Sequence, residues 1–199
     1  MADGCEITFY SMGFSLMAEG IQPSERRRAV FLDRDGVLNV DRGFVAKPDD
    51  FEWVRGAREA VRFLNGAGYL VVVVTNQSGI GRGFHAESDF RSLHNWIDGQ
   101  LENCGAYIDA VYFCPHLPDA PLAEYRVTCE CRKPRPGMLQ QAIREWDIDP
   151  AQSFLIGDRD RDCAAAAAAG VAGYLFDGPD LFEFVRTRIP LSSNHFVEG

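Results

Sequence analysis

Apolar residues fall into five short, nearly continuous runs along the chain. The second run, residues 69–76, contains four consecutive valines and is apolar on both faces. Runs of this kind are typical of strands that are covered on both sides, as in a parallel sheet. We therefore predict five buried strands, at residues 29–33, 69–76, 108–114, 153–158 and 172–177.

Helical periodicity fills the intervals between these runs. Apolar residues recur there at steps of three and four positions, which places them on one face of a helix. The alanine run at 164–169 predicts a further helix because alanine is the best helix former, and Gly170 is placed to end it. The other three stripes are Ala57, Ala60, Val61 and Leu64; Phe90, Leu93, Ile97 and Leu101; and Met138, Leu139, Ala142, Ile143 and Trp146.

Strands that alternate with helices predict an α/β fold built from right-handed βαβ units. The expected architecture is a three-layer α/β/α, doubly wound, Rossmann-like domain with a mostly parallel sheet. No interval between the strands is long enough to hold a large cap domain. We expect a partly ordered leader at residues 1–28 and a single domain at residues 29–199.

Composition and charge narrow the class of partner. The 199 residues include 29 acidic and 20 basic side chains, which gives a formal net charge of −9. This balance argues against a protein that binds nucleic acid or an anionic membrane through a broad basic face. No apolar run is long enough for a membrane span, and the first 28 residues lack the pattern of a secretion signal. We expect a cytoplasmic monomer that acts on a small molecule.

Two aspartates, Asp33 and Asp35, directly follow the first predicted strand. Their carboxylates repel each other and are costly to remove from water, so the pair favours a bound cation. Ligands of doubly wound sheets bind beyond the carboxyl ends of the strands, where Thr75 and Asp158 also lie. Asp33, Asp35 and Asp158 are therefore predicted to hold one Mg²⁺. Asp162, one helical turn after Asp158, is predicted to support the metal ligands without binding the metal itself. The alternative is that D-x-D-G forms only a turn.

Residues that suit a phosphate group lie at the same predicted edge. Thr75 and the backbone N–H groups of residues 76–78 can surround phosphate oxygens, although this stretch also fits a plain strand-to-helix turn. Arg132 and Lys133 precede a helix predicted to begin near Pro136, and their cations can contact phosphoryl oxygens. The alternative for the basic pair is a solvated surface.

The spacing of cysteines predicts a second metal site. Cys114 and His116 form C-x-H, and Cys129 and Cys131 form C-x-C after twelve further residues. Four such ligands suit a closed, tetrahedral, structural Zn²⁺ site with no open position for catalysis. We predict that zinc holds the loop at residues 114–131 in place. The alternative is a group of ordinary buried or free thiols.

Taken together, these motifs resemble those of the haloacid dehalogenase superfamily of phosphatases. The match covers residues 29–177, most of the chain. The resemblance implies that Asp33 is the nucleophile, which carries the phosphoryl group as an aspartyl-phosphate, and that Asp35 is the general acid and base. It also implies Mg²⁺ as cofactor. By resemblance, Thr75 and Lys133 contact the phosphate, and Asp158 is the second acidic residue that binds the metal.

Within the superfamily, residues 31–45, 75–83 and 131–138 are most similar to phosphatases of heptose bisphosphates. The resemblance implies a sugar phosphate as substrate. Histidinol phosphate or another small phosphate monoester is the alternative substrate, and a zinc-stabilised binding module is the non-enzymatic alternative. Arg159 stands where the family usually has lysine. By resemblance, the residues that contact or border the substrate are Asp41, Arg42, Gly43, Phe44, Asn76, Gln77, Ser78 and Arg132.

Overall fold

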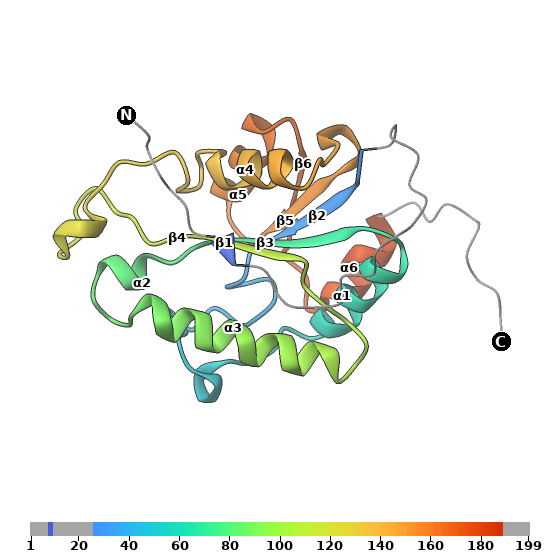
Figure 1. Cartoon of the computed structure of the whole chain (residues 1–199). Coiled ribbons are helices and arrows are strands. Elements are labelled where there is room, and N and C mark those ends of the chain that lie inside the picture. Colours follow the sequence, from blue (N-terminus) through green and yellow to red (C-terminus); the bar gives the residue numbers. More distant parts are fainter. Residues whose placement is uncertain (1–7, 10–25, 189–199) are drawn as a thin grey trace, which may run out of the picture.

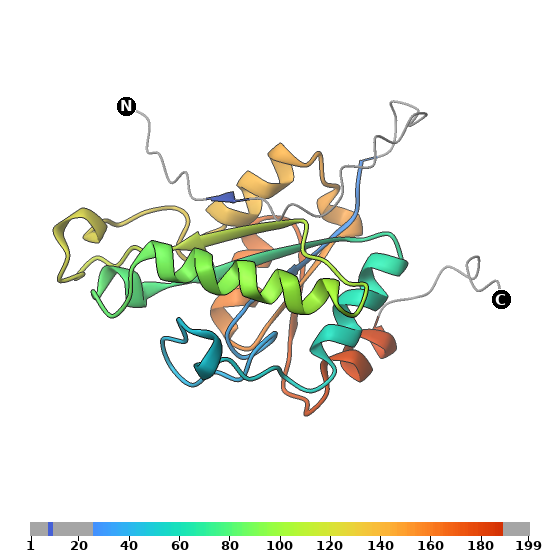
Figure 2. The same ribbon diagram turned by 60° about the horizontal axis from the view of Figure 1, so that its bottom comes forward.

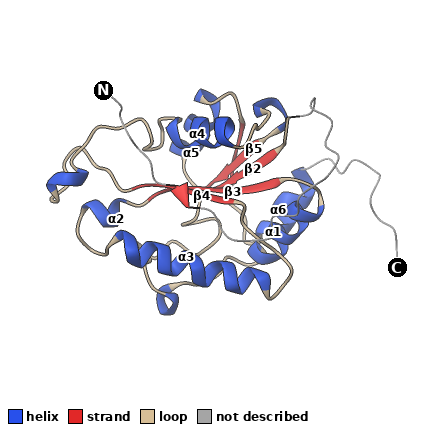
Figure 3. Ribbon diagram, viewed as in Figure 1, coloured by secondary structure: helices blue, strands red, loops and turns tan. Residues whose placement is uncertain are grey.

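The computed structural model describes residues 8–9 and 26–188, which form a three-layer α/β/α arrangement (Figure 1). A central sheet lies between two layers of helices (Figure 3). The predicted α/β fold with a mostly parallel sheet is confirmed. Residues 1–7 and 10–25 of the predicted leader lie outside the described residues.

The sheet has six strands in the order β1-β4-β3-β2-β5-β6. The strand β1 (Thr8–Phe9), from the predicted leader, pairs antiparallel with β4. The other strands pair in parallel, and each overlaps one of the five predicted runs. These are β2 (Ala29–Leu32), β3 (Leu70–Asn76), β4 (Ala110–Cys114), β5 (Phe154–Gly157) and β6 (Ala172–Leu175).

Helices cover both faces of the sheet (Figure 1). On one face lie α4 (Gly137–Glu145) and α5 (Asp160–Ala168). On the other lie α1 (Ala57–Gly66), α3 (Glu87–Glu102) and α6 (Leu181–Arg188). Within residues 26–188, no helix combines the length and the apolarity that a membrane crossing requires. The short elements are α2 (Ser78–Gly81) and the 3₁₀ turns Pro48–Asp50, Ala123–Tyr125 and Pro150–Gln152.

The hydrophobic core consists of two clusters, one on each face of the sheet. Along β2, Val30 and Leu32 belong to one cluster, whereas Ala29 and Phe31 belong to the other. All four side chains are fully buried. A strand buried on both faces is apolar at every position, which explains why the pattern predicted it. Polar side chains can therefore gather only at the ends of the strands.

Three connections meet at the carboxyl ends of the parallel strands. The loop after β2 folds back on itself, with isolated bridges from Asn39 to Asp35 and to Trp53; it is drawn in blue to cyan in Figure 2. The loop after β4 runs beside α2 in both views, and the Leu122 N–H donates to the Gly81 carbonyl (3.3 Å). The loop after β5 leads into α5. These connections surround the candidate site.

Candidate active site

The centre of the site is a buried ion pair at the end of β2. The Lys133 ammonium lies 2.9 Å from Asp33 Oδ2 and 2.7 Å from Asp162 Oδ1, and it donates to the Val74 carbonyl (2.8 Å). All three charged side chains are almost completely buried. The carboxylates of Asp33 and Asp162 and the Val74 carbonyl thus hold the lysine in place, although the four residues come from four separate parts of the sequence.

The surroundings of Asp33 favour its protonated form. Burial raises its pKa to about 6, against the attraction of Lys133, and the charges of Asp162 and Asp35 add to the rise. Below about pH 6 the Asp33 carboxyl group is therefore mostly protonated. A further positive charge beside it would be needed to keep it ionised there.

The carboxylates of Asp33, Asp158 and Asp162 form an acidic group that suits a hard cation. Carboxylate oxygens of Asp33, Asp158 and Asp162 lie within 4.8 Å of one another. Burial raises the pKa of Asp158, and its Oδ1 atom is buried without a hydrogen-bond partner among the described residues. Gly36 permits this close approach, because a Cβ added there would lie 2.4 Å from Asp158 Oδ2. The donor set matches the oxygen ligands that Mg²⁺ prefers.

The carboxylate of Asp35 does not join this acidic group, which differs from the expectation that it shares the metal. It points instead toward Arg34, whose Nη2 lies 2.9 Å from both carboxylate oxygens. Asn39 and Gln77 donate to the same carboxylate at 3.1 and 2.9 Å. Burial alone would raise the pKa of Asp35, but these donors outweigh it and lower the pKa. Neither Arg34 nor Asn39 was predicted to belong to the site. The sequence signal that could have indicated them is a cation and an amide within four residues of Asp35.

Thr75 lies at the end of β3 and accepts a hydrogen bond from Gln77 Nε2 (2.9 Å). Because Gln77 also donates to Asp35, it connects the predicted phosphate ligand with the predicted acid. The Asn76 side chain bonds to the backbone N–H and carbonyl of Lys133, both at 3.1 Å, which connects this predicted substrate-bordering residue with the lysine of the site. Ser78 begins α2.

The predicted substrate-bordering segment, residues 41–44, is connected with the acidic group through Arg159. Arg159 joins the two, with Nε 2.9 Å from Asp158 Oδ2 and Nη2 3.3 Å from Asp41 Oδ2. Phe44 has a left-handed backbone (φ +53°), and its half-exposed ring packs edge-on against Phe84 at 4.7 Å between centroids. Arg42 pairs with Glu52 outside this segment, and within it the Gly43 N–H donates to Asp41.

Arg132 lies beside the zinc candidate and next to Lys133. It is partly buried, and its Nη1 donates to the His116 carbonyl (3.2 Å). Burial lowers the pKa of Arg132, and the nearby charges of Arg161 and Arg82 lower it further.

The four predicted zinc ligands also come together. Their ligand atoms lie within 4.8 Å of one another. The Cys131 sulfur is 3.2 Å from the sulfurs of Cys114 and Cys129, and 3.5 Å from His116 Nδ1. A hydrogen bond from Cys114 lowers the pKa of Cys129 to about 5, so this group already favours one thiolate. Cys114 ends β4, and the other three residues lie in loops. Cys131 is disulfide-bonded in this structure, so the four side chains form a compact set of soft ligands for Zn²⁺ once that bond is reduced.

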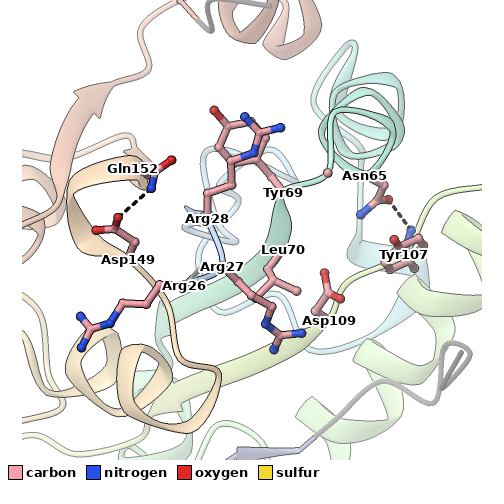
Figure 4. Close-up of a pocket in the computed structure, with 11 residues that line it drawn as sticks. Arg26, Arg27, Arg28, Asn65, Tyr69, Leu70, Tyr107, Asp109, Asp149 and Gln152 are labelled. Atoms are coloured by element: carbon pink, nitrogen blue, oxygen red, sulfur yellow. Dashed lines mark hydrogen bonds between the residues drawn. The ribbon is translucent and has the colours of Figure 1, made fainter. Parts of the chain in front are cut away.

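A cavity of about 890 Å³ lies at the opposite edge of the sheet, by the amino ends of β2, β3 and β4 (Figure 4). Arg26, Arg27 and Arg28 line it, but their guanidinium groups point in different directions. Arg27 donates to the Trp146 carbonyl (3.0 Å), and Arg28 donates to the Ala67 carbonyl. The arginines are thus engaged separately and do not converge on one ligand position.

Comparison with known proteins agrees with this geometry. A family model described as HAD-hydrolase-like matches residues 130–178. Curated D-glycero-beta-D-manno-heptose-1,7-bisphosphate 7-phosphatases from Haemophilus ducreyi and Rhodopseudomonas palustris are 50% and 47% identical to the chain over 146 and 161 residues. The first alignment covers 73% of this chain and 80% of the relative; the second covers 81% and 89%.

Solved structures give the same result. A HAD-like phosphatase from Mesorhizobium loti has a TM-score of 0.73 at 35% identity, covering 77% of this chain and 74% of that one. The D,D-heptose 1,7-bisphosphate phosphatase from B. bronchiseptica, complexed with magnesium and phosphate, has a TM-score of 0.69 at 35% identity, covering 83% and 89%. The chain belongs to the haloacid dehalogenase superfamily of phosphatases, and within it to the same family as the two curated relatives.

Proposed function

We propose that this chain is a Mg²⁺-dependent phosphatase that hydrolyses a phosphate monoester through an aspartyl-phosphate on Asp33. The observation that carries the proposal is the contact between Asp33 and Lys133 at the end of the central strand, beside Asp158. A carboxylate that attacks a polyanionic phosphate needs cations beside it, because charge on the phosphoryl oxygens must be neutralised as it passes.

The side chains of Asp33 and Asp158 would hold the Mg²⁺. Their oxygens lie in one acidic group, and Asp158 Oδ1 has no hydrogen-bond partner among the described residues. When bound, the ion neutralises the phosphoryl group and orients it for attack. Because its carboxylate points away from this group, we assign Asp35 to proton transfer and not to side-chain coordination.

In the first step, a carboxylate oxygen of Asp33 forms a bond to phosphorus while the bond from phosphorus to the sugar oxygen breaks. Lys133 and the Thr75 hydroxyl contact the phosphoryl oxygens. The carboxyl group of Asp35 gives its proton to the departing sugar oxygen. Asp35 leaves this step as a carboxylate, which is the form that its donors Arg34, Asn39 and Gln77 favour.

In the second step, water hydrolyses the aspartyl-phosphate. The Asp35 carboxylate accepts the proton of the attacking water, the bond between phosphorus and Asp33 breaks, and inorganic phosphate leaves. Asp35 is then protonated again, as the first step requires, so the cycle closes without a further reactant.

We propose the 7-phosphate of D-glycero-D-manno-heptose 1,7-bisphosphate as the group removed. The similarity to relatives with that name supports this substrate. The positive charge of Arg132, next to Lys133 in the sequence, also suits a sugar with a second phosphate. The side chain of Arg132 and the segment at residues 41–44 would border the sugar.

We further propose one structural Zn²⁺ on Cys114, His116, Cys129 and Cys131. With Cys131 reduced, four protein ligands complete a tetrahedral site, so this metal would order the loop after β4 without taking part in the reaction. The monomeric state and the cytoplasmic location remain predictions from the sequence.

Phosphate release with Mg²⁺ present tests the function. The wild type should hydrolyse heptose bisphosphate with a much higher kcat/KM than histidinol phosphate, and Asp33→Asn should lose about a thousandfold or more in kcat. A preference for histidinol phosphate would remove the heptose assignment alone. An Asp33→Asn variant as active as the wild type would remove the enzymatic assignment and favour a binding module.

A further inference from the structure

Arg34 separates the two aspartates of the motif, and its side chain is completely buried (0% exposed). A buried guanidinium is costly unless carboxylates and hydrogen-bond acceptors surround it. Nothing in a simple turn requires a charged side chain at this place. The position next to Asp33 and the burial of the charge together indicate a role in the site.

The guanidinium of Arg34 holds the Asp35 carboxylate as a fork. Nη2 lies 2.9 Å from Oδ1 and 2.9 Å from Oδ2, and Nε lies 3.3 Å from Oδ1. Asn39 and Gln77 also donate to this carboxylate, but both are neutral amides. Arg34 therefore supplies the positive charge and the planar geometry that fix the orientation of the carboxylate.

Arg34 also fixes Asp35 relative to three other parts of the molecule. Nη2 donates to the Val45 carbonyl (2.8 Å), directly after the substrate-bordering segment. The same nitrogen lies 3.3 Å from Gln77 Oε1, beyond β3. The guanidinium carbon lies 5.4 Å from the ring centroid of Phe90 in α3. One side chain thus connects Asp35 with a loop, a strand end and a helix.

We propose that Arg34 is the positioning residue that holds Asp35 where it protonates the leaving oxygen, an inference that rests on the proposed phosphatase function. Arg34 itself is buried and does not touch the substrate. In the step that it serves, the Asp35 proton moves to the sugar oxygen as the bond from phosphorus to that oxygen breaks and the bond to Asp33 forms. Loss of Arg34 therefore impairs protonation of the leaving group and spares the attack by Asp33.

Two substrates with different leaving groups test this role. The alkoxide of a sugar phosphate needs a proton as it leaves, whereas p-nitrophenolate leaves without one. For Arg34→Met, we expect kcat/KM to fall about 100-fold for heptose bisphosphate but less than about threefold for p-nitrophenyl phosphate. An equal loss on both substrates, or no loss on either, would overturn the proposal.

A second variant covers the case in which Arg34→Met does not fold. Arg34→Lys keeps the charge but cannot form the fork, so we expect the same selective loss at a smaller size. If Arg34→Lys matches the wild type on both substrates, the fork is unnecessary and the proposal fails. Arg27→Met is the matched control, because Arg27 also lies over an aromatic ring, that of Trp146, at the opposite edge of the sheet. It should leave both kcat/KM values unchanged.

This design separates the inference from the function on which it rests. A wild type that releases no phosphate from either substrate would contradict the proposed function itself. A wild type that is active, with an Arg34→Met variant that loses both substrates equally, would contradict only the role of Arg34.

Discussion

At the scale of single residues, the charges of Asp33, Lys133 and Asp162 depend on one another. Each would be costly to bury alone, and the removal of one partner leaves another charge uncompensated. Asp162 connects this set to the backbone, because its second oxygen accepts a hydrogen bond from the Arg159 N–H (3.0 Å) at the start of α5. Catalysis and local stability therefore share the same side chains.

Asp109, at the opposite edge of the sheet, gives a prediction for the pH dependence of stability. Burial raises its pKa to about 6 from an ordinary value of 3.8, although its carboxylate accepts a hydrogen bond from the Val71 N–H. Between these values the folded protein keeps a proton that the unfolded chain has lost. The contribution of Asp109 to the free energy of unfolding therefore falls as pH rises through this window.

Asp109→Asn removes this titration while keeping an oxygen that can accept from Val71. Relative to the wild type, the variant should gain on the order of 1 kcal/mol in the free energy of unfolding between about pH 5 and about pH 7. Denaturant unfolding at both pH values measures the change. The exposed Asp119→Asn serves as control. A difference between Asp109→Asn and wild type that is the same at both pH values would contradict the assignment.

Sequence patterns placed the residues of the site at one edge but did not give their orientations. Asp33 and Asp158 directly follow buried strands and Thr75 lies at the end of one, and parallel strands bring such positions together. The orientation of Asp35 depends on Gln77, 42 residues away, as well as on Arg34. Patterns along the chain carry no information on such a side-chain rotamer, which explains why Asp35 was expected among the metal ligands.

At the scale of elements, the contact between β5 and α5 positions the lysine of the site. Gly157, the last residue of β5, allows this contact, because a Cβ added there would lie 2.2 Å from the Cβ of Asp162. Gly157→Ala should therefore displace Asp162 from Lys133, lower the melting temperature and reduce kcat at least about tenfold.

Gly99 in α3 offers the matched control for this substitution. A Cβ added there has nothing within 4 Å, and alanine is favoured over glycine in a helix by up to about 1 kcal/mol. Gly99→Ala should keep full activity and stability. If Gly157→Ala also keeps both, the packing of β5 on α5 does not position Lys133 as we describe.

The loop after β4 should depend on its metal. We expect about one Zn²⁺ per chain. Removal with a strong chelator should lower the melting temperature and increase hydrogen exchange in residues 115–131, but not in α1 or α6. Cys129→Ser should lose the zinc, whereas Cys104→Ser, outside the cluster, should keep it. Zinc-free protein with the exchange pattern of the untreated protein would contradict this role.

The helices and strands that were predicted from the sequence are those in which burial alone determines the pattern of apolar residues. The five parallel strands and four of the helices follow from apolar runs and stripes. The helix α6 was not predicted, although Leu181, Phe184 and Val185 have helical spacing and pack on the core. The order of the strands could not be predicted, because pairing depends on contacts between distant segments and not on the pattern within each one.

At the scale of the whole molecule, the two edges of the sheet differ in what they gather. The carboxyl edge holds the acidic group, Lys133 and the zinc candidate, and the residues there come from loops that are far apart in sequence. The amino edge has a cavity of about 890 Å³, but the arginines described there do not converge on one position. The distribution of buried charge therefore indicates the reactive site.

The most direct test is a crystal structure of the protein with Mg²⁺ and beryllium fluoride, a mimic of the phosphoryl group. We predict that beryllium is bonded to a carboxylate oxygen of Asp33, with fluorine atoms near Lys133 and Thr75. Beryllium bonded to Asp35, Asp158 or any other residue would contradict the claim that Asp33 carries the phosphoryl group.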